Sequence, residues 1–403
     1  MSTNLPQPVL NEVGVIALVP DRWSAQWQAR HQIASRLARY FQVLWVDYPL
    51  SRQEILPQLL HPRSGEDQTK LPAGFQIYRP GPRFPRLGGP AALGRWTSKQ
   101  RLRRALQLLV ARGCSQIVLY LWRPEFAQAI SQVPYQLSCY HIDDEYSFSP
   151  LEVGLDPSEI HLIQSVGQVF IHSPTMMEKK GRFNSNTEFV PNGVDYRDYA
   201  TPVPEPDDLR RISHPRIGYS GNLKRMLNWP LMLELSGRHP EWSFVFVGQI
   251  APHAEIRGVL AELSRRRNVH MLGAKPVGAL AAYAQHFDVC IMPYRRDDYT
   301  KYIYPLKLHE YLASGRPVVG TPIPSIEAFD GVVLLANSSE EWTRAITLAL
   351  SPAENTPARC EARRRTASMH DWDLLVERIA ATIAKRLGYS LPHSHKVLDA
   401  TLR

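Results

Sequence analysis

The chain has 403 residues, with 47 Lys and Arg against 38 Asp and Glu, and so a formal net charge of +9. A single hydrophobic core stops growing near roughly 250 to 300 residues, so this length predicts two domains. Hydrophobic residues make up 44% and charged residues 21% of the chain, which excludes a disordered or fibrous protein.

Strand-length apolar runs alternate with segments of helical period along almost the whole chain. In the first half the predicted strands are 13–19, 42–47, 75–78, 116–121, 136–142, 167–172 and 187–190. In the second half they are 215–220, 243–247, 268–272, 288–292, 317–321 and 332–336. This alternation is typical of βαβ units, so we predict an α/β fold with parallel sheets.

Residues 196–214 are polar and proline-rich and show no periodicity, which is the composition of a linker. We therefore predict an N-terminal domain over 1–198 and a second domain over 199–372, each doubly wound and Rossmann-like. In two such domains facing across a cleft, the carboxyl ends of both sheets, and with them any ligand, would lie between the domains.

The apolar runs and the cysteines indicate the cellular environment of the protein. The longest apolar runs, 13–19 and 117–122, fall short of the 18 or so residues that span a bilayer. The opening MSTNLPQPVLNEV lacks the basic and apolar regions of a secretory signal, so we expect a cytoplasmic location. The four cysteines form no metal-ligand spacing, which predicts reduced thiols, with Cys139 and Cys290 in the core, and neither metal nor cofactor.

Much of the positive charge lies in one segment. Between Arg79 and Arg104 there are eight Lys and Arg and no acid. A Pro/Gly-rich loop begins this segment, and a helix is predicted over 96–112. A solvated helix face is the ordinary interpretation, but a basic amphipathic helix also suits an anionic membrane surface. No nucleic-acid-binding motif accompanies it, so we expect no nucleic-acid partner.

Two features of the second half could hold a phosphorylated ligand. Gly221 and Asn222 follow a predicted strand, where a glycine lets backbone N–H groups approach an anion, although a tight turn would look the same. Further on, Pro305 starts and Gly315 ends a predicted helix. Lys307 and Glu310 share one face of this helix. One ligand could therefore place a phosphate at the helix start and a ribose diol on Glu310. A local Lys307–Glu310 ion pair is the alternative.

In the first half, Asp143 and Asp144 end a predicted strand on the side of the expected cleft. Paired acids there could orient a hydroxyl group of a ligand, and Asp144 is the preferred candidate. Capping of a turn is the alternative for these acids, and we expect the nearby His141 to be structural.

Six motifs in register resemble the C-terminal half of a GT-B glycosyltransferase of retaining family 4 (glycosyl transferases group 1), in its bacterial cell-surface polysaccharide branch of teichuronic-acid type. They are FVPNGVD, IGYSGNL, FVFVG, VHMLG, DVCIMPY and PLKLHEYLASGRPVV, and they run from residue 189 onwards. The segments RHQIASRLARY, CYHIDDEYSF and IHSPTMMEK resemble the first half more loosely. The segment after His370 resembles the family's last helix, which crosses back to the first domain, so 373–403 would be that helix and a tail.

The resemblance implies transfer of a sugar from a nucleoside-diphosphate donor to a hydroxyl of a glycan or lipid-linked acceptor, with retention and without a metal. Glu310 resembles the second glutamate of the family's E-x7-E motif, which binds the nucleotide ribose. By the same resemblance, the donor diphosphate would meet Leu306, Lys307, Gly221 and Asn222, and the nucleotide base would lie near Gly273 and Lys275. Such an enzyme would work in the cytoplasm, on the inner face of the plasma membrane if the acceptor is lipid-linked.

Two positions depart from the family's pattern. Tyr302 stands where the first glutamate of E-x7-E is expected, and Asn222 and Leu227 replace the arginine and lysine of its GRLxxxKG motif. Positive charge for the leaving diphosphate must then come from Lys224, Arg225, Lys301 or Lys307, and we take Lys224 and Arg225 as catalytic candidates. A catalytically silent GT-B protein that binds a nucleotide sugar or a partner enzyme, and a GT-B nucleotide-sugar epimerase, are the alternatives.

Overall fold

The computed structural model describes residues 7–25, 27–51, 53–54, 71–82, 84–86, 91–145, 156–251 and 254–391. The chain divides into two compact units. The first comprises Met1–His141, Leu162–Val169 and Val376–Arg403, and the second comprises Ile142–His161 and Phe170–Leu375. This division assigns 142–161 and 170–198 to the second unit, whereas the sequence places them in the first domain.

The first sheet has the strand order β3-β2-β1-β4-β5-β6-β7 among the described residues. Its strands are β1 Leu10–Leu18, β2 Phe41–Val46, β3 Phe75–Tyr78, β4 Gln116–Leu121, β5 Leu137–Ile142, β6 Gln168–Ile171 and β7 Thr187–Phe189. Val15 of β1 lies between Val43 and Val118 of its two parallel neighbours. The chain reverses its direction of strand addition between β1 and β4.

The second sheet has the order β10-β9-β8-β11-β12-β13. Its strands are β8 Arg216–Ser220, β9 Ser243–Val247, β10 Val269–Gly273, β11 Val289–Met292, β12 Val318–Gly320 and β13 Leu334–Leu335. Here the direction of strand addition reverses between β8 and β11. Ligands of doubly wound folds bind outside the carboxyl ends of the strands at such a switch point, so this edge is where a site is expected.

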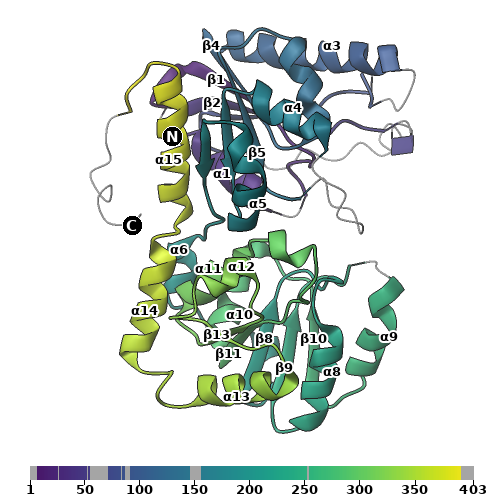
Figure 1. The fold of residues 1–403 in the computed structure, drawn as a ribbon, viewed down its shortest axis with the longest axis vertical. Coiled ribbons are helices and arrows are strands. Elements are labelled where there is room, and N and C mark those ends of the chain that lie inside the picture. Colours follow the sequence, from purple (N-terminus) through teal and green to yellow (C-terminus); the bar gives the residue numbers. More distant parts are fainter. Residues whose placement is uncertain are drawn as a thin grey trace. The chain divides into compact units, whose positions relative to one another are not determined.

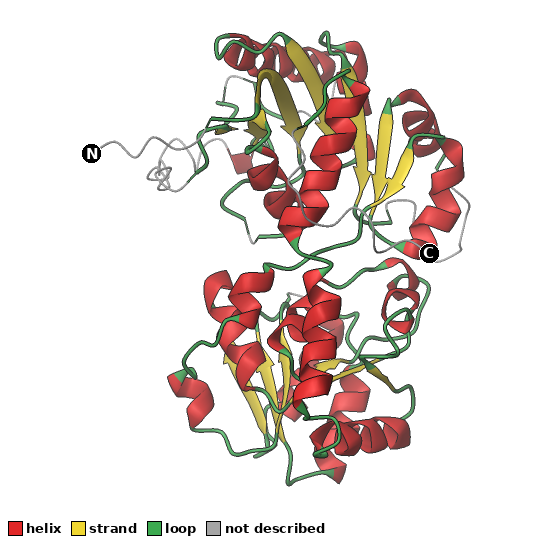
Figure 2. Ribbon diagram, turned by 90° about the vertical axis from the view of Figure 1, so that its left-hand side faces the viewer, coloured by secondary structure: helices red, strands yellow, loops and turns green. Residues whose placement is uncertain are grey.

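Helices flank both sheets (Figures 1 and 2). In the described part of the chain they are α1 Ala29–Leu37, α3 Ala91–Val110, η2 Pro124–Ser131, α4 Pro157–Ser165, α5 Pro174–Lys180, η3 Gly181–Phe183, α6 Tyr196–Ala200, α7 Asp207–Arg210, α8 Trp229–Arg238, α9 Ala254–Leu263, η4 Val277–Ala279, α10 Leu280–His286, η5 Thr300–Tyr302, α11 Leu306–Ser314, α12 Pro324–Glu327, α13 Ser339–Leu350, α14 Pro357–Ser368 and α15 Trp372–Arg386.

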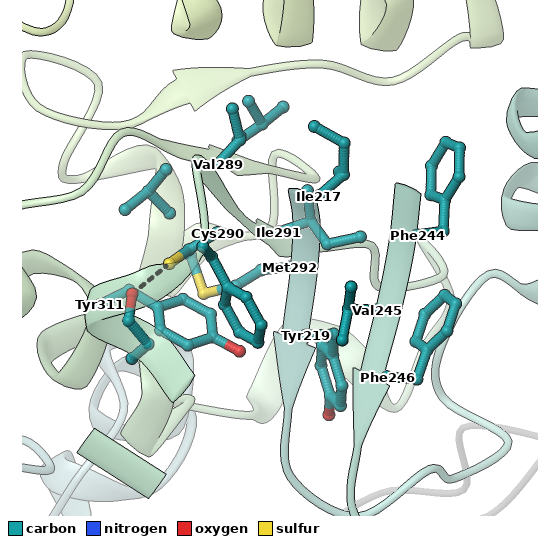
Figure 3. Packing of buried hydrophobic residues seen from close by; sticks show 14 of the residues in the cluster. Ile217, Tyr219, Phe244, Val245, Phe246, Val289, Cys290, Ile291, Met292 and Tyr311 are labelled. Atoms are coloured by element: carbon teal, nitrogen blue, oxygen red, sulfur yellow. Dashed lines mark hydrogen bonds between the residues drawn. The ribbon is translucent and has the colours of Figure 1, made fainter. Parts of the chain in front are cut away.

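The core of the second unit shows why its strands are near-continuous apolar runs. All five residues of β9 are buried, and Phe244 and Phe246 pack in the cluster drawn in Figure 3 together with Ile217, Ile291 and Tyr311. A parallel strand covered by helices on both faces has no solvent side, so its sequence does not alternate with polar residues.

The predicted α/β class with two parallel sheets is confirmed, and every predicted strand overlaps an observed one. The helix predicted to start at Trp96 starts at Ala91 and ends at Val110. In α15, buried residues recur every three to four positions, and Arg386 donates to the carbonyl oxygen of Gly167 over 3.0 Å. Contacts assign Val376 and the following residues to the first unit, as the crossing-back helix requires.

Cys139 and Cys290 are fully buried, as expected for core positions, and neither is in a disulfide. Burial raises the pKa of the Cys290 thiol to about 12, so it stays protonated. In the part of the chain that the structure describes, no helix is both long and apolar enough to span a membrane.

Candidate active site

Three glycines end neighbouring strands at the carboxyl edge of the second sheet. Gly221, Gly248 and Gly273 follow or close β8, β9 and β10, with φ angles of +134°, +153° and +70°. The N–H of Gly221 donates to the Val247 carbonyl oxygen, and that of Gly248 donates to the Gly273 carbonyl oxygen, each over 2.8 Å. Side chains are therefore missing at this edge, and a ligand can approach the backbone closely.

Helix α11 begins beside this edge and has the predicted ends. Pro305 is its N-cap, and Gly315, with φ +78°, is its C-cap. The start of the helix is fixed from outside, because Asn192 Nδ2 donates to the Tyr304 carbonyl oxygen over 2.7 Å. The Tyr304 hydroxyl also lies 2.9 Å from His309 Nε2. The N–H groups of the first turn of α11 are thus held in one place.

Lys307, in the first turn of α11, reaches the glycine turns. Its Nζ lies 5.0 Å from the centre of the Tyr219 ring, and a Cβ atom added to Gly221 would lie 3.1 Å from it. Burial opposes the charge, but the oxygens of Tyr219, Tyr294, Tyr311 and Glu310 outweigh burial and hold the pKa of Lys307 well above its ordinary value. The lysine therefore stays a cation.

Lys224, in the turn after β8, lies near Lys307. Burial lowers the pKa of Lys224 and the charge of Lys307 lowers it further, while Asp144 acts in the opposite direction. Among the described residues neither lysine has a carboxylate within 4.0 Å, so the local Lys307–Glu310 ion pair is not formed. Two cations held together without a paired acid make this edge attractive to a diphosphate.

The turn after β8 is firmly attached to the end of β11. The N–H of Asn228 donates to the Pro293 carbonyl oxygen over 2.7 Å, and the Trp229 indole donates to the Lys224 carbonyl oxygen over 2.9 Å. Leu227 is 1% exposed and pairs with Tyr294 in an isolated bridge. Leu227 is therefore a core residue, and the cations of this turn are Lys224 and Arg225.

Glu310 lies one turn after Lys307 on the same helix and is half-buried. The Tyr199 hydroxyl of α6 lies against its carboxylate. Burial raises the pKa of Glu310, and the Lys307 charge opposes that rise. This carboxylate can accept hydrogen bonds from a diol, as the sequence predicts for the ribose.

Asp144 follows the end of β5 and belongs to the second unit. Its Oδ1 accepts from the Glu145 N–H over 2.8 Å and from the Tyr299 hydroxyl over 3.3 Å. Burial and the charge of Asp143 raise the pKa of Asp144. His172, also near both acids, is buried with a lowered pKa, and its Nδ1 lies 3.0 Å from the Ile142 carbonyl oxygen.

His141 is structural, as expected. It is 2% exposed, its Nδ1 lies 2.9 Å from the Tyr120 hydroxyl, and its ring stacks on Trp122. Its hydrogen bond and its stacking are both made inside the first unit.

Tyr302, at the position of the missing glutamate, lies between two cations. Its ring centre is 4.8 Å from Lys179 Nζ and 5.3 Å from Lys301 Nζ, and the residue is 9% exposed. Lys179 also pairs with Glu145 over 3.1 Å, and Lys301 pairs with Asp298 over 3.2 Å. The phenol ring thus contacts two lysine side chains, each of which also pairs with a carboxylate.

The remaining predicted residues are placed as follows. Lys275 pairs with Asp208 over 2.7 Å, so part of its hydrogen-bonding capacity is already used beside Gly273. Arg225 is exposed and lies 3.9 Å from Glu255. Leu306 is the first residue of α11, and Asn222 follows Gly221 with its carbonyl oxygen 3.3 Å from the Tyr219 hydroxyl.

Sequence reasoning missed the tyrosines and one lysine of this site. They are Tyr199, Tyr219, Tyr294, Tyr299 and Lys179. Tyr219 and Tyr294 stand at or just after strand ends of the switch point, which is a usable signal. Tyr199 and Lys179 come from short helices and carry no local signal. Among the described residues, no cluster of His, Cys, Asp or Glu could hold a metal ion.

Sequence comparison relates part of the chain to known glycosyltransferases. Residues 215–351 match the family described as glycosyl transferases group 1. The Bacillus subtilis (strain 168) protein TuaH, whose name assigns it to teichuronic acid biosynthesis as a glycosyltransferase, is 33% identical over 178 residues. That alignment covers 42% of this chain and 43% of TuaH, so it spans less than half of this relative's length.

Solved structures match nearly the whole chain. The E. coli trehalose-6-phosphate structure with bound UDP-2-fluoro glucose has a TM-score of 0.64 at 11% identity, covering 93% of this chain and 98% of that one. A glycosyltransferase of Rickettsia africae has 0.65 at 11% identity, covering 94% and 100%. A UDP-forming trehalose-phosphate synthase of Burkholderia xenovorans has 0.64 at 12% identity, covering 93% and 100%.

At such low identity these structures establish the fold. The chain therefore has the GT-B fold that its motifs predict, and its residues 215–351 match the glycosyl transferases group 1 family.

Proposed function

We propose that this protein is a glycosyltransferase of cell-surface polysaccharide synthesis, which moves a sugar from a nucleoside-diphosphate donor to a hydroxyl of a glycan or lipid-linked acceptor. The observation that carries the proposal is the pair Lys224 and Lys307, two cations without a paired acid beside the glycine turn at Gly221. The family match over 215–351 and the name of TuaH support it.

In this proposal the leaving diphosphate binds between the glycine turns and the first turn of α11. Negative charge grows on the leaving group as the bond to the sugar breaks, and both lysines and the helix N–H groups stabilise that charge. Glu310, one turn further on, accepts hydrogen bonds from the ribose hydroxyls. The donor is thus held at its ribose and at its phosphates.

Asp144 acts on the other side of the reacting sugar. With the Tyr299 hydroxyl as its hydrogen-bond donor, it orients a hydroxyl of the acceptor or of the donor sugar. Retention of the anomeric configuration follows from the family resemblance, with the leaving phosphate taking the proton of the attacking hydroxyl. No metal or cofactor takes part in this proposal.

The first test is the stabilisation of the folded protein by nucleotides, since a ligand of the folded state raises the unfolding temperature. Wild type, Glu310→Ala and Lys224→Gln are titrated with UDP, GDP, ADP, CMP and TDP. The control is Arg257→Gln, which changes an exposed residue of α9. One nucleoside diphosphate should stabilise wild type and the control. Glu310→Ala should lose most of this response, and Lys224→Gln should lose more of it for that nucleoside diphosphate than for the monophosphate of the same nucleoside. If no nucleotide stabilises folded wild type, the proposal fails.

The second candidate is a catalytically silent protein of the same fold, favoured by Tyr302 in place of a glutamate. Such a protein would bind the nucleotide but would release no nucleoside diphosphate from its sugar donor. Release of nucleoside diphosphate that depends on an acceptor extract, and that stops in Lys224→Gln, supports the enzyme. Binding without release supports the silent protein.

We further propose that the basic segment 79–104 rests on the inner face of the plasma membrane. Leu93 and Trp96 are 42% and 50% exposed on α3, and Arg103 and Arg104 are exposed on the same helix. Arg83 and residues 87–90 lie outside the described residues. Apolar side chains among cations are typical of helices that lie in the interface of an anionic membrane.

Co-sedimentation with vesicles tests this placement. Wild type should sediment with anionic vesicles and not with neutral ones. Trp96→Ala, and separately Arg103→Gln with Arg104→Gln, should each reduce binding. Equal binding to neutral vesicles would contradict the proposal, and so would binding that survives both sets of changes.

A further inference from the structure

A cavity of about 310 Å³ opens in the first unit, and part of the basic segment 79–104 lines it. The ends of β1 and β2 contribute to it, and so do α3 and η2. Its size lies at the lower end of the roughly 300 to 1,000 Å³ of small-molecule sites. Since β1 borders the switch point of the first sheet, the cavity stands where a doubly wound fold binds its ligand.

Part of the cavity wall is apolar and aromatic. Leu18, Val46, Leu102 and Phe126 line it, and the Tyr48 ring lies edge-on to Phe126. Such walls suit the carbon skeleton of a sugar or an isoprenoid better than a free inorganic ion.

Three arginines, Arg86, Arg95 and Arg101, are among the residues that line the same cavity. Two of them are held in place. Arg86 lies over the Tyr48 ring at 4.9 Å and donates to its hydroxyl over 2.8 Å. Arg101 donates to the Phe84 and Pro85 carbonyl oxygens over 2.8 and 2.9 Å, and these neutral partners leave its charge uncompensated.

The two carboxylates of the cavity do not balance these cations. Asp47 accepts from the Trp23 N–H over 2.7 Å and from the Trp45 indole over 2.9 Å, and it lies 3.5 Å from Arg79 Nε. Glu125 faces the Tyr48 hydroxyl. With Asp47 neutralised by Arg79, a positive excess remains inside the cavity.

We propose that this cavity binds a phosphate ester carried by the acceptor, and the assignment to the acceptor rests on the proposed function. Three guanidinium groups from a loop and from two positions of α3 can surround a tetrahedral phosphate, whereas a carboxylate is satisfied by one fork-to-fork pair. The apolar and aromatic walls take the organic part of the ester.

Two sources could supply that phosphate, a sugar phosphate or a lipid phosphate. Along α3, residues 91, 94, 95, 98, 101 and 102 line the cavity, and the exposed Leu93 and Trp96 stand beside this row. An isoprenoid chain leaving the cavity would find these two side chains, whereas a sugar phosphate would not use them. A change at Trp96 therefore separates the two sources.

Isothermal titration of the full chain tests the proposal. The probes are farnesyl monophosphate below its micelle concentration, glucose 6-phosphate, inorganic phosphate and glucuronate. The variants are Arg95→Gln, Trp96→Ala and, as the control, Arg257→Gln, which is exposed on α9 and does not line the cavity. Arg95 has no hydrogen-bond or ion-pair partner among the described residues, so its change should not disturb the fold.

A phosphate ester should bind wild type and Arg257→Gln equally, bind Arg95→Gln about tenfold more weakly, and bind better than glucuronate. Loss of farnesyl phosphate affinity in Trp96→Ala identifies the lipid source, and unchanged affinity identifies the sugar phosphate. Equal loss in Arg257→Gln, or glucuronate binding as tightly as the esters, overturns the proposal.

The nucleotide response keeps this test separate from the donor site. Arg95→Gln should keep the full thermal response to the nucleoside diphosphate that stabilises wild type. If the protein binds a phosphate ester through Arg95 but responds to no nucleotide, the cavity proposal stands and the proposed donor site fails. A protein that responds to a nucleotide but binds none of the esters would remove the cavity proposal alone.

Discussion

A Cβ atom on Gly248 would lie 2.0 Å from the carbonyl oxygen of Gly221. The turns after β8 and β9 therefore touch backbone to backbone, and the Gly221 turn that lies under Lys307 rests on the turn beside it. At a φ of +153°, Gly248 also has a conformation that other residues rarely adopt.

Gly248→Ala should destabilise the protein by about 3 kcal/mol, because the added methyl group must push the Gly221 turn away and the backbone must change conformation. Gly258→Ala is the control. Gly258 lies in α9 with open space around it, so alanine should raise the free energy of unfolding by up to about 1 kcal/mol. Urea denaturation of both variants measures the difference, and equal stabilities would show that the two turns can separate freely.

Lys180→Met should cost about 3 to 5 kcal/mol of unfolding free energy. The Lys180 ammonium is fully buried and pairs with Glu145 over 2.9 Å and with Glu159 over 3.0 Å, so its removal takes away the buried cation that the two carboxylates share, although Lys179 stays with Glu145. Lys301→Met is the comparison, because its pair with Asp298 is solvent-exposed and should cost less than about 1 kcal/mol. A loss below 1 kcal/mol in Lys180→Met would contradict the buried network.

Glu310→Gln should change the pH dependence of stability. Burial raises the pKa of Glu310, so the folded state binds a proton at pH values where the unfolded chain has lost it. The stabilisation from this protonation is complete at low pH and is lost as pH rises through the folded-state pKa.

The melting temperature of Glu310→Gln should therefore gain on wild type as pH increases from 4 to 7. Glu340→Gln should do the opposite, since the hydrogen bond from Arg238 lowers the pKa of Glu340. Parallel wild-type and Glu310→Gln curves across this range would refute the raised pKa.

Tyr302 should tolerate loss of its hydroxyl but not of its ring. Tyr302→Phe keeps the aromatic face toward Lys179 and Lys301, so its stability should stay within about 0.5 kcal/mol of wild type. Tyr302→Leu removes both cation–π contacts and should cost about 1 kcal/mol or more. Chemical denaturation distinguishes them, and equal losses in the two variants would make the hydroxyl the important group.

Local patterns predicted the parts of the fold whose causes are local. The apolar run of β9 and the Pro305 and Gly315 ends of α11 each follow from properties of a few consecutive residues. Lys180 could not be recognised in the same way. Lys180 belongs to a polar stretch whose sequence predicts the exposed face of a helix. The side chain is buried because Glu145 and Glu159, from other parts of the chain, pair with it.

The basic segment shows the same limit on a larger scale. The sequence presents its cations as one continuous patch, but the fold uses several of them for packing. Arg79 lies against Asp47, Arg86 lies over Tyr48, and Arg101 is bonded to loop carbonyls. Such partners come from distant positions in the chain, so the part of the charge that remains for a ligand became visible only in three dimensions.

The PNGVD segment, residues 191–195, holds the start of α11 in place, which is a structural role independent of catalysis. Asn192 holds the Tyr304 carbonyl, and Val194 exchanges backbone hydrogen bonds with His370 and Trp372, each over 3.0 Å. A Cβ on Gly193 would lie 2.7 Å from the His370 carbonyl oxygen. The segment connects the start of α11 with residues 370–372. A related protein that had lost its catalytic activity would therefore still need this segment for its fold. A search with this motif should therefore find active and inactive proteins alike, and under the proposed function Lys224 and Lys307 are the pair that distinguishes them.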